Sequence, residues 1–392
     1  MNIAIFTDTY FPDANGIAVS AKLLADVLKE HGHNVLVVTS SNAKNKPSNE
    51  NGVYYLPSPN EKRKNFVALI GKYQMPIYRL VRTFKPDVVH NKTNGFVGQL
   101  GKYAAKKLRI PLVYTYHVHY EEYAPYVGGG AYLRLVRARE RRYFAHMAKI
   151  STEFIAPSIK IKNYLRKKGI DKSINVIPTA ILPKDFEMDE SVNKDVKYIR
   201  KKYDIKDDEK VVLYIGNLTR EKNIDLLINA FDKFNKQCQK YHAHLLILGE
   251  GPRYDDFADM IRALDLQNRI HLVGKVNHDK VKSYYAASDV FASPSTSETQ
   301  NITIMEAMIA RCLVLAKEDE SLIGVLEEGE TGYTFTGEEH FVHKLEKLFD
   351  LDNKEVEAIK DAAQKFILEN YSVDKFYERV IEVYENAQRK NW

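Results

Sequence analysis

Two carboxylates in the second half of the chain, Glu298 and Glu306, stand eight residues apart in a strongly apolar setting. Glu298 closes the loop after a short apolar run, and Glu306 lies in the helical pattern that follows, among Ile302–Met308. Burying a carboxylate there is costly unless it has a partner. Carboxylates accept hydrogen bonds from sugar-type hydroxyls, and the beginning of a helix favours a phosphate. The segment therefore predicts a site for a ligand with both groups; the alternative is that Glu306 is a surface residue of an amphipathic helix.

Three further loops contain residue types that suit a phosphorylated ligand. Gly216–Asn223 follows an apolar run and brings Arg220 and Lys222 to the beginning of a helix, which suits a diphosphate. Gly249–Pro252 follows the next run, and its glycines allow close approach of the backbone. Gly16 has the same property, although no GxGxxG pattern surrounds it. The alternatives are a solvated turn for the first segment and an ordinary loop around Gly16.

Short apolar runs alternate with amphipathic helical patterns along the whole chain. Continuous apolar runs are typical of strands buried on both faces, and the alternation is typical of βαβ units. The sequence therefore predicts an α/β protein with two Rossmann-like, doubly wound sheets. Because such sheets bind ligands at the carboxyl ends of their strands, we expect the loops above to face a central cleft between two domains. The predicted strands are 3–7, 34–39, 53–56, 87–90, 111–116, 153–156, 175–177, 211–215, 244–248, 269–273, 289–292 and 313–316.

The seam between the two predicted domains lies at Ile177–Pro183, where two prolines interrupt both neighbouring elements. We expect an N-terminal domain over residues 1–182 and a C-terminal domain over residues 183–372. The second domain begins with a polar, charged segment at 184–208. The last segment, 373–392, contains a helix that follows the completed second sheet and is therefore free to pack elsewhere.

The composition excludes several classes of protein. Of the 392 residues, 44% are hydrophobic and 28% charged, which is typical of globular domains and not of disordered chains. No apolar stretch is long enough to span a bilayer, and the first residues read as a strand and not as a signal peptide. Cys238 and Cys312 support neither a disulfide framework nor a metal cluster. We therefore expect a cytoplasmic protein without a metal.

The charge is unevenly distributed along the chain. Residues 1–190 carry 29 Lys and Arg against 16 Asp and Glu, and the remainder carries 29 against 36. This asymmetry favours a polyanionic partner for the basic half. The alternative is that the surface is generally rich in lysine and that the excess of basic residues has no partner. An anionic membrane is preferred over nucleic acid, because no nucleic-acid-binding module is recognisable.

A basic amphipathic helix is the candidate for membrane contact. Its basic side chains fall along or beside one stripe at helical spacing, at Arg134, Arg137, Arg141, Arg142 and Lys149. The alternative is a core-facing helix whose basic face is merely solvated.

Four motifs spread over almost the whole chain resemble those of family GT4, the retaining, nucleotide-sugar-dependent glycosyltransferases with the GT-B fold. The motifs are Thr7-Asp8 with Pro12 and Gly16, Gly216 with Glu221-Lys222, Gly249–Pro252, and Glu298 with Glu306. The segments 115–123 and 316–320 resemble in particular the bacterial 1,2-diacylglycerol 3-glucosyltransferases. The resemblance implies that the last helix crosses back to the first domain.

The resemblance also implies a role for each motif residue. Glu306 is expected to hold the ribose hydroxyls of the nucleotide, Glu298 a hydroxyl of the donor sugar, and Lys222 the diphosphate. His117 is expected to line the reaction centre. The other residues expected to bind the donor are Gly16, Asn217, Gly249, Val276, Asn301 and Ile302.

The sequence departs from the family pattern at four positions. Asn217 stands where the family has the diphosphate-binding arginine, and Arg220 is the candidate replacement that would share the catalytic role of Lys222. Asn301 replaces a glycine beside the phosphate, Arg311 replaces the glycine after the helix of Glu306, and Ala180 replaces a glycine at the hinge. These departures favour the rival interpretation of a non-catalytic GT-B subunit.

The leading interpretation is an enzyme peripheral to the inner face of the cell membrane. It transfers a hexose, with glucose as the first choice, from a UDP-sugar to a lipid acceptor, with diacylglycerol as the first choice. The reaction retains the anomeric configuration and needs no metal or cofactor, and the Asp350–Asp352 DxD sequence is assigned to helix capping. Within the enzyme class, the alternative acceptor is soluble or polyprenyl-linked. UDP binding distinguishes the enzyme from the non-catalytic subunit.

Overall fold

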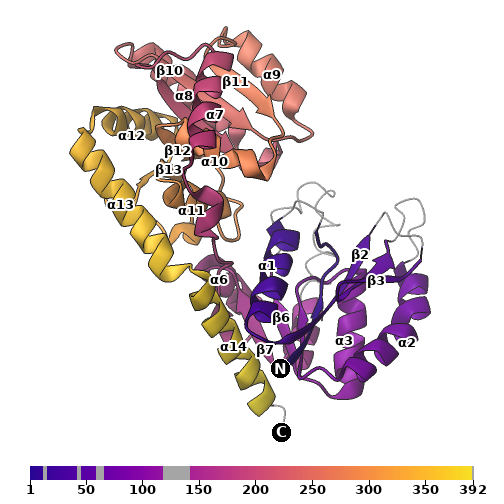
Figure 1. Cartoon of the computed structure of the whole chain (residues 1–392). Helices are drawn as coiled ribbons and strands as arrows, with labels where there is room; N and C mark the ends of the chain where they lie inside the picture. The colour runs from indigo at the N-terminus through magenta and orange to yellow at the C-terminus, as the bar shows by residue number, and fades with distance from the viewer. Residues whose placement is uncertain (12–15, 42–45, 59–65, 118–141, 391–392) are drawn as a thin grey trace. The chain divides into compact units, whose positions relative to one another are not determined.

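The computed structural model describes residues 1–11, 16–41, 46–58, 66–117 and 142–390. The chain divides into two compact units (Figure 1). Unit 1 comprises Met1–Ala180 together with Val373–Trp392, and unit 2 comprises Ile181–Ser372. Each unit is an α/β structure built on a parallel sheet, so the predicted fold class is confirmed.

Unit 1 contains an eight-stranded sheet in the order β3-β4-β2-β1-β5-β6-β7-β8. All of its pairings are parallel except that of the edge strand β3 with β4. Apolar side chains of α1 and α14 pack on one face, and those of α2, α3 and α6 on the other. The strands are β1 Asn2–Phe6, β2 Asn34–Ser41, β3 Ser48–Glu50, β4 Val53–Pro57, β5 Val88–Asn91, β6 Leu112–Thr115, β7 Glu153–Ala156 and β8 Ile174–Val176. The helices are α1 Gly16–Glu30, α2 Phe66–Phe84, α3 Phe96–Leu108, α6 Ile159–Lys167 and α14 Val373–Arg389.

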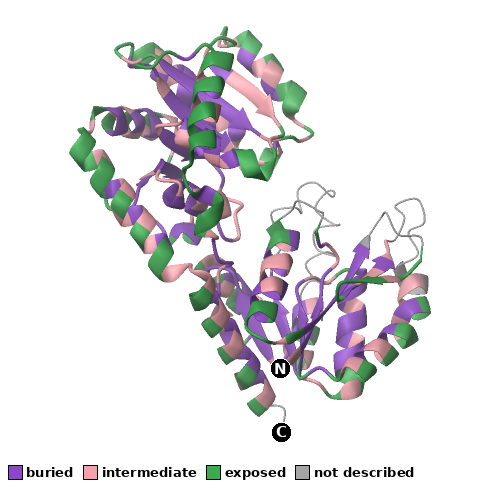
Figure 2. Cartoon of the chain, in the orientation of Figure 1, coloured by how far each residue is buried: buried purple, intermediate pink, exposed green. Residues whose placement is uncertain are grey.

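Unit 2 contains a six-stranded, all-parallel sheet in the order β11-β10-β9-β12-β13-β14. Its inner strands are buried on both faces, as Figure 2 shows, because α8, α9 and α12 cover one face and α7, α10 and α11 the other, whereas the edge strand β11 is half-buried. The strands are β9 Lys210–Ile215, β10 Ala243–Leu248, β11 Ile270–Gly274, β12 Val290–Ser293, β13 Leu313–Lys317 and β14 Tyr333–Phe335. The helices are α7 Glu190–Lys202, α8 Ile224–Gln237, α9 Tyr254–Ala263, α10 His278–Ala286, α11 Ile302–Ile309, α12 Glu338–Asp350 and α13 Asn353–Asn370. The short 3-10 helices are η2 Pro183–Phe186, η3 Arg220–Lys222 and η4 Glu320–Leu322.

Helix α14 is remote in sequence from the rest of unit 1 but belongs to its core. Its apolar residues repeat at helical spacing, so that Phe376, Val380, Val383 and Ala387 are all buried on one face. They pack against residues of β5, β6, β7 and α1. Tyr384, on the same face, is fully buried and hydrogen-bonds to His90 Nδ1 of β5 at 2.7 Å.

The polar, charged segment at 184–208 contains helix α7, which the sequence analysis did not predict. The side chain of Asp189 accepts hydrogen bonds from the backbone N–H groups of Ser191 and Val192, which caps the beginning of the helix. Only Val192 and Ile199 of α7 are buried. Because this apolar stripe is narrow and the segment is highly charged, its sequence does not indicate a helix.

Candidate functional site

The loops after β9 and β10 in unit 2 touch each other through their backbones. Gly216 N donates to Leu248 O at 3.0 Å, and Leu218 N donates to Glu250 O at 2.9 Å. Gly249 has φ +142°, and a Cβ atom there would stand 1.9 Å from Gly216 O. Only glycine fits this position, because side chains clash there and avoid that backbone region. The two glycine loops identified from the sequence therefore lie side by side at the carboxyl ends of β9 and β10.

An ion pair joins the loops after β9 and β12. Lys222 Nζ lies 2.5 Å from Glu298 Oε1, and the two side chains are 17% and 27% exposed. Lys222 ends η3, whose first residue, Arg220, is exposed, and its guanidinium has no hydrogen bond or ion pair with the described residues. An anionic ligand that contacts Lys222 must share it with Glu298.

Glu306 projects from α11 into an almost closed environment. Its side chain is 14% exposed. Glu306 Oε2 lies 3.2 Å from Tyr285 Oη, and Oε1 lies 4.0 Å from His278 Nε2. Burial raises the pKa of Glu306 to about 7; the Tyr285 hydrogen bond opposes this shift and Asp185 adds to it. The helical periodicity that identified Glu306 from the sequence did not identify Tyr285.

The beginning of α11 is organised by a residue in the left-handed region. Asn301 has φ 60° and ψ 47°, which are values that favour glycine and are tolerated by asparagine. Its side chain is buried, and Nδ2 donates to Ser321 Oγ at 2.6 Å. Ser321 in turn hydrogen-bonds to Asp319. Asparagine can therefore replace the family glycine without changing the backbone of this turn.

The other predicted donor-binding residues of unit 2 lie along the same carboxyl edge of the sheet. Asn217 is exposed in the loop after β9, Val276 is half-buried after β11, and Ile302 is the first residue of α11. The structure thus brings the predicted residues of unit 2 to the ends of neighbouring strands. Arg220 and Asn217 are both exposed, and no contact joins Arg220 to another described side chain.

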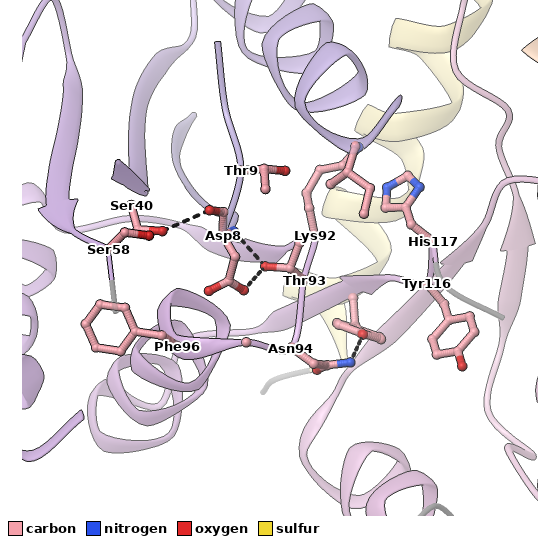
Figure 3. Close-up of a pocket in the computed structure, with 13 residues that line it drawn as sticks. Asp8, Thr9, Ser40, Ser58, Lys92, Thr93, Asn94, Phe96, Tyr116 and His117 are labelled. Carbon is pink, nitrogen blue, oxygen red and sulfur yellow. Dashed lines mark hydrogen bonds between the residues drawn. The ribbon is translucent and has the colours of Figure 1, made fainter. Parts of the chain in front are cut away.

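Unit 1 has its own cavity at the carboxyl ends of its strands, with a volume of about 400 Å³ (Figure 3). Asp8, after β1, accepts a hydrogen bond from Val97 N at 2.7 Å and another from the Thr93 hydroxyl. These bonds hold the carboxylate at the beginning of α3, where a negative charge is stabilised. The cavity is lined by Asp8, Thr9, Ile17, Ser40, Ser58, Lys92, Thr93, Asn94, Gly95, Phe96, Tyr114, Tyr116 and His117.

His117 lines this cavity just beyond β6, as its labelled side chain in Figure 3 shows. Its Nε2 atom is buried and has no hydrogen-bond partner among the described residues. Burial, together with Lys92 and His90, holds the pKa of His117 well below its usual range. Lys92 is itself buried, donates to Ser20 Oγ at 2.7 Å, and has its pKa lowered by burial to about 7. His117 is thus a neutral imidazole with one nitrogen available to a ligand.

The predicted basic stripe is described only in part. Arg134, Arg137 and Arg141 lie outside the described residues. Arg142 and Lys149 are exposed on the described helical stretch 142–150, whose opposite face buries Phe144 and Met147. Gly16 is exposed as the first residue of α1. None of the helices in the described ranges is both long and apolar enough to cross a membrane.

The DxD sequence has a structural role. Asp352 accepts a hydrogen bond from Glu355 N, and Glu355 accepts one from Asp352 N, which forms a capping box at the beginning of α13. Asp350 pairs with Lys240 at 3.0 Å. Assignment of this sequence to helix capping is therefore confirmed for Asp352.

The fold is that of several solved glycosyltransferases. A glycosyltransferase from Rickettsia africae aligns with a TM-score of 0.77 at 18% identity, covering 98% of this chain and 97% of that one. Anabaena HepE, solved in complex with UDP and glucose, aligns with a TM-score of 0.75 at 17% identity, covering 98% and 99%. The two units therefore define the chain as a protein of the GT-B glycosyltransferase class.

The sequence comparisons give the family. Residues 14–184 match the model described as Glycosyltransferase Family 4, and residues 195–365 match that described as Glycosyl transferases group 1. The alpha-monoglucosyldiacylglycerol synthase of Acholeplasma laidlawii is 30% identical over 88% of this chain and 87% of that protein. The enzyme of the same name from Streptococcus pneumoniae is 28% identical over 96% and 85%. The chain belongs to glycosyltransferase family 4, as its motifs indicated.

Proposed function

We propose that this chain is a retaining, metal-independent hexosyltransferase that transfers glucose from UDP-glucose to diacylglycerol at the inner face of the cell membrane. The observation that carries the donor half of the proposal is Glu306, a buried carboxylate without a cation in hydrogen-bonding contact. Its helix, α11, follows β12, which is the neighbour of β9 in the sheet, and the loops after β9 and β10 allow backbone approach. The acceptor half is supported by the two synthases that the chain resembles over most of its length.

In the proposed donor complex, Glu306 accepts hydrogen bonds from both ribose hydroxyls of uridine. Lys222 contacts the diphosphate, together with Arg220 and the backbone N–H groups at the beginning of α11. Glu298, released in part from Lys222, accepts a hydroxyl of the sugar. The contact between Lys222 and Glu298 holds both side chains near the positions that this donor complex requires. HepE, which has a similar fold, binds UDP and glucose.

The acceptor is assigned to the cavity of unit 1. Its aromatic and aliphatic lining, which includes Ile17, Phe96 and Tyr114, suits the apolar part of a lipid near its glycerol. The unpartnered Nε2 of His117 offers a hydrogen bond to a hydroxyl group of the donor or the acceptor. Arg142 and Lys149, together with the stripe at Arg134–Arg141, attract anionic lipid surfaces.

The proposed reaction proceeds on one face of the sugar. The acceptor hydroxyl oxygen forms a bond to the anomeric carbon as the bond from that carbon to the diphosphate oxygen breaks. The hydroxyl proton passes to the departing diphosphate, so no enzymic nucleophile is required. Lys222 and the N-terminus of α11 stabilise the charge that develops on the leaving group.

The test is a product assay with UDP-[14C]glucose and diacylglycerol in mixed micelles that contain phosphatidylglycerol and EDTA. We expect a labelled lipid that α-glucosidase cleaves and β-glucosidase does not. Glu306→Ala is the negative control for the donor site. Label that remains water-soluble while UDP is released favours the soluble-acceptor alternative. A wild-type protein that binds neither UDP nor UDP-glucose is instead a non-catalytic subunit.

A further inference from the structure

The hydroxyl group of Tyr285 is shared by two acceptors. Tyr285 Oη lies 3.0 Å from the backbone oxygen of Thr303 and 3.2 Å from Glu306 Oε2. The tyrosine side chain is 1% exposed and packs against Phe186 and Phe291, so the hydroxyl points from the core of unit 2 toward α11. A phenol has one proton to donate and can also accept a hydrogen bond. Tyr285 can therefore donate a hydrogen bond to only one of these two oxygens at a time.

The protonation state of Glu306 decides which oxygen Tyr285 serves. If Glu306 is ionised, the tyrosine proton goes to the carboxylate. If Glu306 carries a proton, it donates a hydrogen bond to Tyr285 Oη, and Tyr285 donates one to Thr303 O. Each of the three groups then has a hydrogen-bond partner. Burial favours the second state, because it disfavours the charged carboxylate and raises its pKa to about 7.

The other groups that face Glu306 do not supply a fixed positive charge. His278, from the same helix as Tyr285, is 65% exposed and lies 4.0 Å from Glu306 Oε1. Asp185, in η2, adds a negative charge that disfavours ionisation of Glu306 further. Lys222 is bound to Glu298. In the ligand-free protein, Glu306 therefore keeps its proton to a higher pH than an exposed glutamate does.

We propose that Tyr285 is a positioning residue that accepts a hydrogen bond from the carboxylic acid of Glu306 in the ligand-free protein and donates one to its carboxylate when nucleotide binds. On binding, the proton of Glu306 leaves for solvent, and both ribose hydroxyls donate to the carboxylate. The tyrosine proton then turns from Thr303 O to Glu306 Oε2. This inference rests on the proposed function for the nucleotide, but its first step concerns the empty protein alone.

The first experiment titrates the empty protein. The 13C resonances of labelled Glu side chains are followed with pH in the wild type, and Glu306→Gln identifies the resonance of Glu306. We expect a midpoint near pH 7 in the wild type and a higher one in Tyr285→Phe, because loss of the donated hydrogen bond destabilises the carboxylate. Tyr284→Phe is the matched control: its neighbouring, buried hydroxyl interacts with Tyr203, so the midpoint stays unchanged. A wild-type midpoint near that of an exposed Glu, or one unmoved in Tyr285→Phe, overturns the proposal.

The second experiment measures nucleotide binding by calorimetry with UDP-glucose, whose diphosphate has no group that titrates near neutral pH. Affinity in the wild type should be about tenfold weaker at pH 6 than at pH 8, because only the ionised site binds. The profile should shift to higher pH in Tyr285→Phe and not in Tyr284→Phe. Below pH 7, the enthalpy should vary with the ionisation enthalpy of the buffer, as expected for release of a proton. A pH-independent affinity overturns the coupling, whereas absence of binding at every pH contradicts the proposed function and leaves the titration result standing.

Discussion

Asn301 and Arg311 occupy backbone positions that glycine usually fills in the family, and the structure explains how each is tolerated. Both have positive φ, at 60° and 58°. Asn301 is held by Ser321, and the guanidinium of Arg311 pairs with Glu357 and Asp361 of α13. The left-handed conformation costs a non-glycine residue about 1–2 kcal/mol, and these contacts offset part of that cost. Neither replacement therefore argues against a working site.

At the residue scale, Glu306→Ala should weaken UDP binding. Hydrogen bonds to a charged group contribute about 1.5–3 kcal/mol, so we expect a loss of roughly ten- to a hundred-fold at pH 8, where the carboxylate is ionised. Isothermal titration calorimetry measures this directly. Glu298→Gln is the comparison: it should leave UDP affinity nearly unchanged and lower turnover, because its proposed partner is the sugar. Equal UDP affinity in wild type and Glu306→Ala would remove Glu306 from the nucleotide site.

Gly249→Ala tests the contact between the two glycine loops. The added Cβ would stand 1.9 Å from Gly216 O, and φ +142° is unfavourable for alanine. The loop must therefore move, and we expect a lower melting temperature together with loss of UDP binding. Gly337→Ala is the control, since its Cβ would meet nothing within 4 Å. Wild-type melting and UDP affinity in Gly249→Ala would contradict this role of the glycine.

The sequence singles out residues where a motif surrounds them and does not single out those that only burial brings to the candidate site. Glu306 was found because a carboxylate in an apolar helical pattern is unusual. Tyr285 was missed, since a tyrosine in an amphipathic helix is ordinary and its contact with Glu306 crosses two helices. Asp8 was found only as part of a motif, and its role at the beginning of α3 depends on a loop 85 residues away.

At the element scale, α14 contributes a polar contact as well as apolar packing to unit 1. Tyr384 Oη bonds to His90 Nδ1, and His90 Nε2 bonds to Thr115 Oγ1 at 2.6 Å. Tyr384→Phe leaves a buried ring nitrogen unsatisfied, which costs about 1–3 kcal/mol. We expect a fall of several degrees in the melting transition of unit 1 by differential scanning calorimetry. Tyr198→Phe, at a residue that is 65% exposed, should melt as the wild type does, and an unchanged Tyr384→Phe would show that the contact adds no stability.

The sequence predicted strands and helices correctly where their apolar pattern was strong. All twelve predicted strands are present, each within two residues of its predicted ends. The three-residue edge strands β3 and β14 were missed, although β8, of the same length, was predicted; β3 contains no apolar residue. Helix α13 was missed as a helix although its capping aspartate was identified correctly, because only Ile359, Ala363 and Ile367 of its eighteen residues are buried.

At the scale of the whole molecule, the charge asymmetry predicts salt-sensitive membrane binding. Reversal of Arg134, Arg137 and Arg141 to Glu changes the charge by six units in the half of the chain that carries the excess. This variant should no longer sediment with phosphatidylglycerol vesicles and should lose activity on lipid but keep its affinity for UDP. Binding of the wild type should weaken as salt rises, because charges act over only ~8 Å at physiological ionic strength.

The matched control for this experiment makes the same charge change in unit 2. Lys194, Lys197 and Lys201 are exposed along α7. Their reversal to Glu should leave sedimentation unchanged if the basic stripe of unit 1 makes the contact. Equal pelleting of the wild type and the arginine variant would instead mean that these arginines face solvent, and a soluble acceptor would become the better proposal.

The position of α14 also has a consequence for the order in which the protein can fold during synthesis. Unit 2 is inserted within unit 1, since the chain leaves unit 1 after Ala180 and returns to it at Val373. All strands of unit 2 have therefore emerged from the ribosome before the helix that completes unit 1 is made. Until then, the apolar face formed by residues such as Val88, Val113 and Ile155 lacks its α14 cover. Unit 1 begins translation first but completes its core last, and its uncovered apolar face stays exposed to aggregation for the time that translation of unit 2 takes.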